Sequence, residues 1–328
     1  MTRQESESSL SAEALHWVAR QCGRAPSINN SQPWHLRWDG RHFELFGDRG
    51  RQLAVSDPAG RELTISCGAA LFNLRMSLSA LGCATTCERL PDPAQPDLLA
   101  RVHVCDHGGM DDPPPPPAAL IRRHTHRGAM GDEELPRRLA AVIHLAASHE
   151  GAQLHFVGDP GPLRAILTLA HLAEWNAAGD AAKRREAEAW APTVPSPEGV
   201  PASSYPAGSV MADPTELQPR DFDLGRNVGG LEPAASPVKH LAVLCTQADA
   251  PLDWVRAGEG LEAALIAAAE EWWFARIHSR VCEEAAGRRE LQRHLGTQAF
   301  PHLILQFGRG STFAATPRRP VSEYLEIR

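Results

Sequence analysis

Two short segments, far apart in this chain of 328 residues, constrain its fold more than any other feature. The first is Ala25-Pro26-Ser27-Ile28-Asn29-Asn30-Ser31-Gln32-Pro33-Trp34 (the Pro-Ser loop), in which prolines that fix backbone φ flank hydrogen-bonding Ser, Asn and Gln side chains. The second is Arg122-Arg123-His124-Thr125-His126-Arg127 (the basic segment). A rigid polar loop can hold donors against a planar ligand, and clustered arginines beside a hydroxyl suit a phosphate. Neither segment alone identifies a function.

Together the two segments resemble motifs of the nitroreductase-like FMN-binding flavoproteins. That family holds one FMN with a segment Arg-x-Ser/Thr-x-Lys/Arg and a loop Pro-Ser-x-x-Asn-x-Gln-Pro-Trp, which match Arg123-x-Thr125-x-Arg127 and Pro26-Ser27-x-x-Asn30-x-Gln32-Pro33-Trp34. A further family element, a C-terminal basic run, corresponds to Pro317-Arg318-Arg319-Pro320-Val321. Here the Pro-Ser loop precedes the basic segment, an order that resembles the fused, Acg-type branch with two nitroreductase-like halves in one polypeptide.

The resemblance implies FMN as cofactor and a set of residues that hold it. The phosphate and ribityl end would be held by Arg123, Thr125, Arg318 and Arg319. The ring and ribityl chain would be lined from the other half by Pro26, Ser27, Ile28, Asn30 and Gln32. Arg127 would lie near the pyrimidine edge of the ring; for any single arginine, a solvated surface position is the alternative. His124 and His126 depart from the family pattern; we expect them to face solvent, and the alternative is that they replace a neutral contact with a titratable one.

The resemblance also implies an α+β fold in which two fused halves, with mixed sheets and long central helices, form an intramolecular pseudo-dimer. The first half would span residues 1–112 and the second 118–328, joined by five prolines at 113–117 in a stiff polyproline II spacer. Each half carries a motif that the other lacks, so the chain would build one complete flavin site and one dead site. A monomer is compatible with this arrangement because the partner half is internal.

Hydrophobic spacing predicts helices at 10–22, 62–81, 133–149, 163–175 and 260–277. Alternating or short apolar runs predict strands at 34–38, 43–46, 101–105, 153–157, 241–246 and 303–307. A shift of 198 residues places Gly60 on Gly258 and Leu63 on Leu261, at the start of two helices rich in small residues. Chance alignment explains this repeat as well as duplication does, and the family resemblance favours duplication.

Residues 192–230 are dense in Pro, Gly and Ser and show no clear periodicity. So long an irregular stretch in a compact protein is typical of a functional lid or of a disordered segment. We expect a lid over the flavin, and a disordered surface loop is the alternative.

Two further patterns are interpreted as structural. Gly258-Glu259-Gly260-Leu261-Glu262-Ala263 matches a dinucleotide fingerprint, but the preceding strand ends near Thr246, so we interpret it as the start of a helix. A zinc site is suggested by Cys83, Cys87, His103, Cys105 and His107. Alternation of His103 and Cys105 with valines instead favours a half-exposed strand. We predict no metal ligands.

Composition argues against several functional classes. A net charge of −7 argues against a nucleic-acid binder, and no apolar run reaches the length of a membrane span. The first ten residues are polar and lack the apolar stretch of a secretory signal, and seven scattered cysteines suit a reducing compartment. We therefore expect a cytoplasmic protein that binds a small molecule rather than nucleic acid or membrane.

Family analogy predicts an oxidoreductase that takes electrons from NAD(P)H and passes them through FMN to nitro compounds or quinones in a ping-pong cycle. In such a cycle the flavin performs the chemistry, so no nucleophile is needed and we assign no catalytic residue. The alternative is a flavin-binding or flavin-sequestering protein with little turnover, which a single intact site under a long lid would suit.

Overall fold

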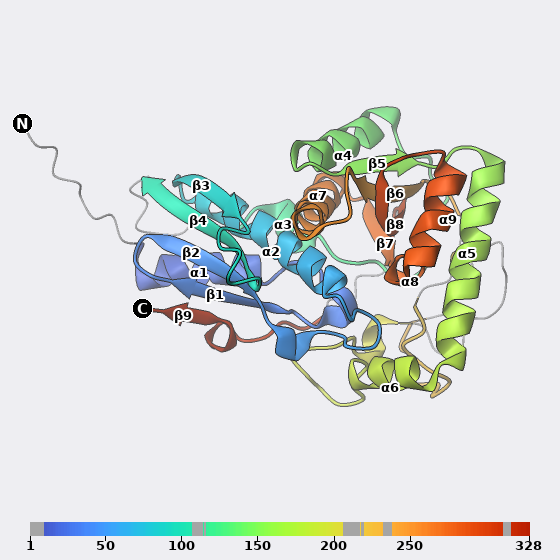
Figure 1. Cartoon of the computed structure of the whole chain (residues 1–328), viewed down its shortest axis with the longest axis horizontal. Coiled ribbons are helices and arrows are strands. Elements are labelled where there is room, and N and C mark those ends of the chain that lie inside the picture. Colours follow the sequence, from blue (N-terminus) through green and yellow to red (C-terminus); the bar gives the residue numbers. More distant parts are fainter. Residues whose placement is uncertain are drawn as a thin grey trace, which may run out of the picture.

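The computed structural model describes residues 10–106, 114, 116–205, 217, 220–231, 238–310 and 316–328. Parts of the expected polyproline join (113 and 115) and of the expected lid (206–216 and 218–219) lie outside these residues. Two sheets lie on opposite sides of a central pair of long helices, α2 and α7 (Figure 1). Each half therefore contributes a sheet and one central helix, which confirms the expected α+β fold with two halves packed through long helices.

The sheets have the same strand order, apart from one extra strand. The first sheet runs β3-β4-β2-β1-β9, with strands β1 (Trp34–Trp38), β2 (His42–Gly47), β3 (Ala84–Arg89), β4 (Leu98–Asp106) and β9 (Leu325–Ile327). The second runs β5-β6-β8-β7, with strands β5 (Gln153–Phe156), β6 (Leu241–Thr246), β7 (Phe274–His278) and β8 (Phe300–Gly308). Corresponding pairs are antiparallel in both sheets: β1–β2 as β5–β6, β2–β4 as β6–β8, and β3–β4 as β7–β8.

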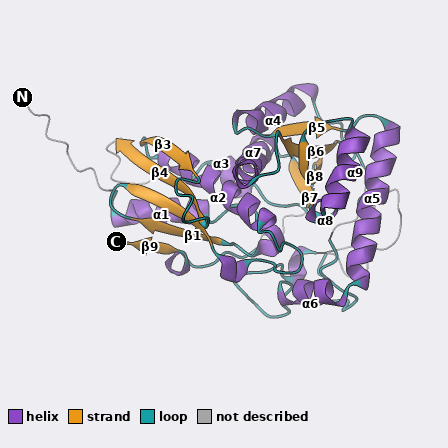
Figure 2. Cartoon of the chain, viewed as in Figure 1, coloured by secondary structure: helices purple, strands orange, loops and turns teal. Residues whose placement is uncertain are grey.

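Helices surround the two sheets (Figure 2). The first half contains α1 (Ala12–Cys22) and α2 (Arg61–Ala80). The remaining helices are α3 (Ala118–Arg122), α4 (Arg137–His149), α5 (Pro160–Gly179), α6 (Ala181–Ala189), α7 (Pro251–Glu270), α8 (Arg280–Glu283) and α9 (Ala285–Leu295). Residues 157–240, which include α5 and α6, are inserted between β5 and β6, where residues 39–41 suffice between β1 and β2. A smaller insertion, residues 279–299 with α8 and α9, lies between β7 and β8, where residues 90–97 suffice between β3 and β4. The second half therefore repeats the strand topology of the first half with two insertions.

The two central helices touch backbone to backbone at a pair of glycines. A Cβ atom on Gly68 of α2 would lie 2.2 Å from the Val255 carbonyl oxygen, and one on Gly258 of α7 would lie 2.0 Å from the Ile65 carbonyl oxygen. The contact is reciprocal, because Gly68 and Gly258 are separated by 190 residues, as are Ile65 and Val255. A shift of 190 residues thus relates the two central helices, and the shift of 198 residues predicted for them from small-residue matches is wrong.

Two of the predicted boundaries are also wrong. The helix predicted at 260–277 is α7, which begins at Pro251 and ends at Glu270, while residues 274–278 form strand β7. Proline at the first helical position is compatible with a helix start, since the amide that it lacks would have no intrahelical partner there. The dinucleotide-like run 258–263 lies inside α7 rather than at its start, and its glycines serve helix packing.

The chain's C-terminal end returns to the first sheet. Strand β9 pairs in parallel with β1, and Leu36 N donates to the Tyr324 carbonyl oxygen at 2.6 Å. The basic segment joins the second sheet, where Thr125 forms a parallel bridge with Ala275 of β7. These two pairings bring the C-terminal basic run and the basic segment to the Pro-Ser loop, which directly precedes β1.

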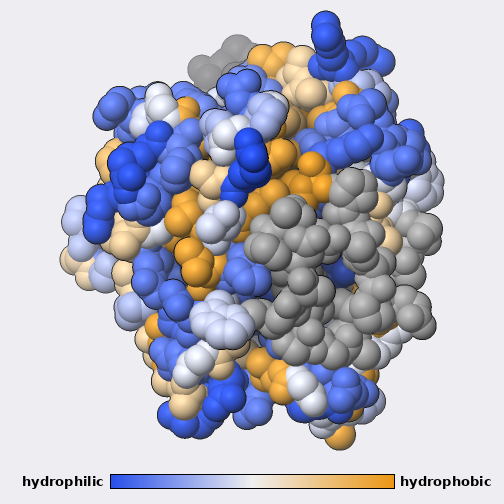
Figure 3. All heavy atoms as spheres, turned by 90° about the vertical axis from the view of Figure 1, so that its right-hand side faces the viewer, coloured by the Kyte–Doolittle hydropathy of each residue, from blue (hydrophilic) through white to orange (hydrophobic). Residues whose placement is uncertain are grey.

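The face along α5 carries hydrophobic residues at the surface among hydrophilic ones (Figure 3), and Leu172 and Trp175 of this helix are exposed. No described helix combines the length and the apolar character that crossing a membrane requires.

Candidate functional site

Two adjoining cavities lie where the Pro-Ser loop, the basic segment and the helices α2 and α7 meet. The first contains about 860 Å³ of space that no protein atom fills and the second about 630 Å³, and both figures include space that is open to solvent. Four residues line both cavities: Pro26, Ser27, Thr125 and Arg127. A ligand that is longer than either cavity can therefore extend from one into the other.

The Pro-Ser loop takes an unusual backbone path along these cavities. Asn29, Asn30 and Gln32 have φ angles of 48°, 54° and 50°, in the left-handed region that side chains other than glycine rarely adopt. Ser27 Oγ closes the loop by accepting from Gln32 N at 2.9 Å, and Ile28 N donates to Ser66 Oγ of α2 at 3.2 Å. The loop is thus fixed to itself and to the central helix.

Asn30 and Gln32 tie the loop to two distant parts of the chain. Asn30 Nδ2 donates to the carbonyl oxygens of Gly199 (2.9 Å) and Pro317 (3.1 Å). Gln32 Nε2 donates to the Pro197 carbonyl oxygen at 2.9 Å. Asn30 lines the second cavity, whereas Gln32 is fully buried and lines neither cavity, so it supports the loop from behind.

The second cavity is lined by four arginines: Arg24, Arg123, Arg127 and Arg318. None of the described residues that line it is acidic. The Arg24 carbonyl oxygen holds two of these arginines in place, because it accepts from Arg123 Nη2 at 2.7 Å and from Arg318 Nη2 at 3.0 Å. Arg123 Nη1 and Arg318 Nε are buried and have no hydrogen-bond partner within the described part of the chain. Buried donors left unpaired are costly, so this cavity has donors to offer an anion.

The electrostatics of these arginines show that positive charge is in excess. Burial, together with the charge of nearby Arg123, lowers the pKa of Arg127 to about 10 and that of Arg318 to about 9. The Arg127 guanidinium carbon lies 5.8 Å from the centroid of the Phe222 ring. An incoming anion would relieve the repulsion between these cations.

Of the two remaining predicted residues, Ile28 lines a cavity and Arg319 does not. Ile28 lines the first cavity beside Ile65 and Leu261. Arg319 lines neither cavity: its backbone N donates to Gln32 Oε1 at 2.8 Å, and its Nε pairs with Glu323 at 3.2 Å. Arg319 therefore clamps the Pro-Ser loop, while Arg318 faces the cavity.

The expectation that both basic-segment histidines face solvent is wrong. His126 is 1% exposed, and its Nε2 lies 2.8 Å from the Ala129 carbonyl oxygen. His124 is half-buried, with its ring centroid 4.3 Å from that of Phe274. Burial lowers the pKa of His124 to about 4, so it is neutral at pH 7. Both rings turn inward because the basic segment extends the edge of the second sheet.

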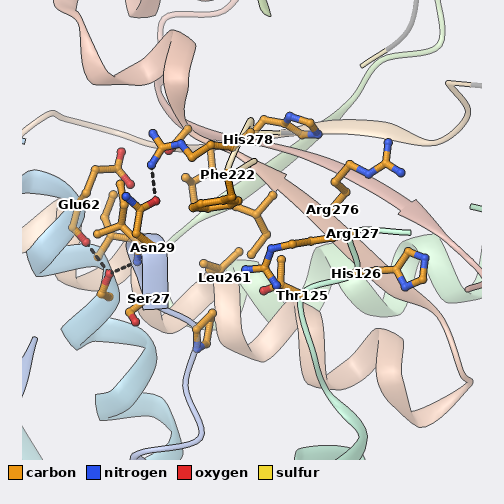
Figure 4. Close-up of a pocket in the computed structure, with 18 of the residues that line it drawn as sticks. Ser27, Asn29, Glu62, Thr125, His126, Arg127, Phe222, Leu261, Arg276 and His278 are labelled. Atoms are coloured by element: carbon orange, nitrogen blue, oxygen red, sulfur yellow. Dashed lines mark hydrogen bonds between the residues drawn. The ribbon is translucent and has the colours of Figure 1, made fainter. Parts of the chain in front are cut away.

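The first cavity is also lined by residues that the motifs did not identify. Arg220 and Phe222 come from the larger insertion, and Glu62 comes from the start of α2. Phe222 and Glu62 are labelled in Figure 4. Arg220 bridges the two halves: it donates to Asn29 Oδ1 at 2.5 Å and pairs with Glu283 of α8. Burial raises the pKa of Glu62 to about 7, although Arg61 pairs with it. No periodic pattern surrounds Arg220 in the sequence, so only the structure could place it here.

The described residues contain no group of three or more His, Cys, Asp or Glu side chains arranged to hold a metal ion.

Two curated proteins are similar to this chain over most of its length. A Mycobacterium tuberculosis (strain ATCC 25618 / H37Rv) protein named "Putative NAD(P)H nitroreductase Rv3131" is 30% identical over 328 residues, which cover 96% of this chain and 92% of the relative. The chain belongs to the nitroreductase family. A second relative from that strain, which carries the same description and the name acg, is 26% identical over 311 residues, with 93% of each chain covered. These relatives confirm the resemblance that the Pro-Ser loop and the basic segment indicated.

This nitroreductase-family chain is also similar to a solved nitroreductase with bound FMN from Desulfitobacterium hafniense DCB-2. The match covers 62% of this chain and 93% of the solved one, at 14% sequence identity and a TM-score of 0.37. No family model matches the chain.

Proposed function

We propose that this member of the nitroreductase family binds one FMN across the two cavities and uses it to pass electrons from NAD(P)H to a nitro compound or a quinone. The observation that carries the proposal is the second cavity. Among the residues that the structure describes, four arginines and no acidic residue line it, and its buried guanidinium nitrogens Arg123 Nη1 and Arg318 Nε have no hydrogen-bond partner. Guanidinium groups bind phosphate with charge-assisted hydrogen bonds, and a phosphate dianion would use these donors.

The two cavities suit the two ends of FMN. Arg123, Thr125 and Arg318 would hold the phosphate in the second cavity. The first cavity offers apolar walls to a flat ring from Ile28, Ile65 and Leu261, and it contains the Arg127 guanidinium. A cation beside the ring favours negative charge that develops there on reduction. When bound, FMN supplies the redox chemistry by accepting a hydride and passing electrons on.

The cofactor proposal is tested by replacing Arg123 with Ala and measuring FMN binding by fluorescence titration. Loss of charge-assisted contacts worth about 1.5–3 kcal/mol is expected to raise the Kd by about ten- to a hundredfold. The matched control is Arg101→Ala, since Arg101 pairs with Glu44 in the first sheet and lines neither cavity. Wild-type protein that stays colourless after incubation with FMN would refute the proposal.

The activity is tested by anaerobic stopped-flow mixing of the FMN-loaded protein with NADH or NADPH. Rapid bleaching of the flavin absorbance, followed by its return on addition of a nitroaromatic or a quinone, is expected for the oxidoreductase and its ping-pong cycle. Full flavin occupancy with no bleaching by either nucleotide would instead favour the sequestering protein. This second candidate is supported by Arg220, which lines the first cavity and is held there by its contacts with Asn29 and Glu283.

A further inference from the structure

Glu262 of α7 is a buried carboxyl group beside the second cavity that the proposed function does not use. Its side chain is 0% exposed, in the interface between α2 and α7. Its Oε1 lies 3.1 Å from Arg123 Nε and accepts a hydrogen bond of 3.0 Å from Asn73 Nδ2 of α2. Its Oε2 is buried and has no hydrogen-bond partner among the residues that the structure describes. A buried carboxylate oxygen without a hydrogen-bond partner favours protonation, because an unpaired negative charge is costly in the protein interior.

The surroundings of Glu262 place its titration near neutral pH. The charged groups that act on it are Arg123 from the basic segment and Arg318 from the C-terminal basic run, while α2 contributes the neutral Asn73. Burial raises the pKa of Glu262 to about 7, and these three residues pull it the other way without overcoming burial. The carboxyl can therefore change protonation when the charge beside it changes.

Arg123 is the group through which a ligand would change that charge. Its Nε faces Glu262, its Nη2 donates to the Arg24 carbonyl oxygen, and its buried Nη1 has no partner within the described ranges. Arg123 also lines the second cavity. One guanidinium thus stands between a buried carboxyl and the place proposed for a phosphate.

We propose that Glu262 is a proton-linked counter-ion of the phosphate-binding end. It neutralises Arg123 while that end is empty, and its Oε2 takes up one proton from solvent when a phosphate dianion becomes the second anion beside Arg123. Two anions that share one guanidinium in a medium of low dielectric repel each other, and protonation removes one of the charges. The inference rests on the proposed function, since it takes the ligand to be phosphorylated.

Proton uptake fixes the direction of the pH dependence. A higher pH opposes binding that consumes a proton, so FMN affinity falls as pH rises above 7, by up to about tenfold per pH unit. The phosphate itself does not cause this fall, because its second pKa is about 6 and it is already a dianion. Riboflavin, which has no phosphate, should bind with no such dependence.

The test is calorimetric titration with FMN at pH 7.5 and 8.5 in two buffers of different ionisation enthalpy, which counts protons taken up per ligand. The wild type should take up a proton, whereas Glu262→Gln should take up none and bind equally at both pH values. The matched control is Glu259→Gln, the same substitution one helical turn away. Glu259 is equally buried but pairs with Arg75 and Arg89 and lines neither cavity, so this variant should behave as the wild type does.

Two results would overturn the inference: wild-type binding of FMN without proton uptake, or equal uptake by Glu262→Gln. If Glu262→Gln does not fold, the number of protons that the wild type takes up on binding FMN decides the inference by itself. Failure of FMN to bind at all is failure of the proposed function, and sulfate, a dianion throughout this range, then replaces FMN. Thermal stabilisation by sulfate that weakens with rising pH in the wild type but not in Glu262→Gln would support the counter-ion, and absence of stabilisation would reject it.

Discussion

Three residues of the Pro-Ser loop have left-handed backbone, and each is held by a different arginine. Asn29 Oδ1 accepts from Arg220, Asn30 Oδ1 accepts from Arg318 at 3.1 Å, and Gln32 Oε1 accepts from the backbone N of Arg319 at 2.8 Å. Non-glycine residues in this region cost about 1–3 kcal/mol each and persist only where their surroundings fix them. Here arginines from the larger insertion and from the chain's C-terminal end fix the loop.

The buried carboxyl of Glu62 should make the stability of the protein depend on pH. Its pKa is raised to about 7 in the folded protein from an ordinary value of 4.5, so its contribution to stability is complete below pH 4.5 and is lost as pH rises through 7. Glu62→Gln cannot lose that contribution. The free energy of unfolding of the variant minus that of the wild type should therefore increase from pH 5 to pH 8. The increase should be up to about 1.4 kcal/mol per pH unit between the two pKa values.

Urea unfolding of both proteins at pH 5, 6, 7 and 8 measures this difference. A difference in the free energy of unfolding that stays constant over the range would contradict the prediction, whatever the overall stability of the variant.

Sequence reasoning could name residues of the site only where a motif marks them. Eight of the ten residues named from the family motifs line a cavity, and the other two, Gln32 and Arg319, support the loop. Arg220 was missed because no periodicity surrounds it, and Glu262 because it lies inside a run that matched a dinucleotide fingerprint. The importance of both comes from contacts with residues far away in the sequence, which spacing alone cannot reveal.

The crossing of α2 and α7 is the element on which the arrangement of the halves depends. Gly68 and Gly258 let the two backbones touch, because a side chain at either position would meet a carbonyl oxygen. The other cavity-facing parts of these helices are positioned by this contact, including Ser66 and Leu261. Close packing at this crossing thus sets the width of the first cavity.

Gly258→Ala is predicted to destabilise the protein, since its Cβ would lie 2.0 Å from the Ile65 carbonyl oxygen and force the helices apart. Overpacking of this kind costs about 1–3 kcal/mol or more. The matched control is Gly179→Ala in α5, where a Cβ meets nothing within 4 Å. Alanine there should leave stability unchanged or raise it by up to about 1 kcal/mol. Urea midpoints measure both, and equal midpoints would refute the role given to the crossing.

The ends of the two central helices show why one boundary was predictable and the other was not. After α2 the chain turns at Gly82, with φ of 76°, and the glycine signals the end of the helix. After α7 the corresponding residue, 190 positions later, is Trp272, with φ of 61°. Tryptophan gives no such signal, and the apolar run that follows can be assigned to helix or strand with equal ease. The helix prediction therefore continued into β7.

At the scale of the whole molecule, the shift of 190 residues locates the counterpart of the site in the other half. Ser66 and Ser279, which line the first cavity, correspond to Arg256 and Arg89. Arg89 pairs with the buried Glu259 at 2.6 Å, and the connection that leads into β5 is only Glu150-Gly151-Ala152. At the position in the other half that corresponds to the site, arginines therefore stand where the site has serines, and a three-residue turn stands where the site has the Pro-Ser loop.

We therefore predict one FMN per chain of 35.6 kDa, in a protein that is a monomer. Titration of the apoprotein with FMN, followed by absorbance at the flavin maximum, gives the stoichiometry, and analytical ultracentrifugation of the loaded protein gives the mass. Saturation at two FMN per chain would show that the second position also binds. Saturation at one FMN shared by two chains would show that the site needs a second copy.

The insertion of residues 157–240 has a consequence for how such a chain can evolve. Its helix α6 reaches the first half, where Glu186 accepts from the backbone N atoms of Val55 and Ser56 at 2.8 and 2.9 Å, and its Arg220 reaches Asn29. In a dimer of identical subunits every insertion appears twice, and both copies must fit around the twofold axis. Fusion of the halves removes that restriction, because a segment added to one half can grow across the other without meeting its own copy. A single chain can thus elaborate one site with material that a symmetric dimer would have to accommodate at both.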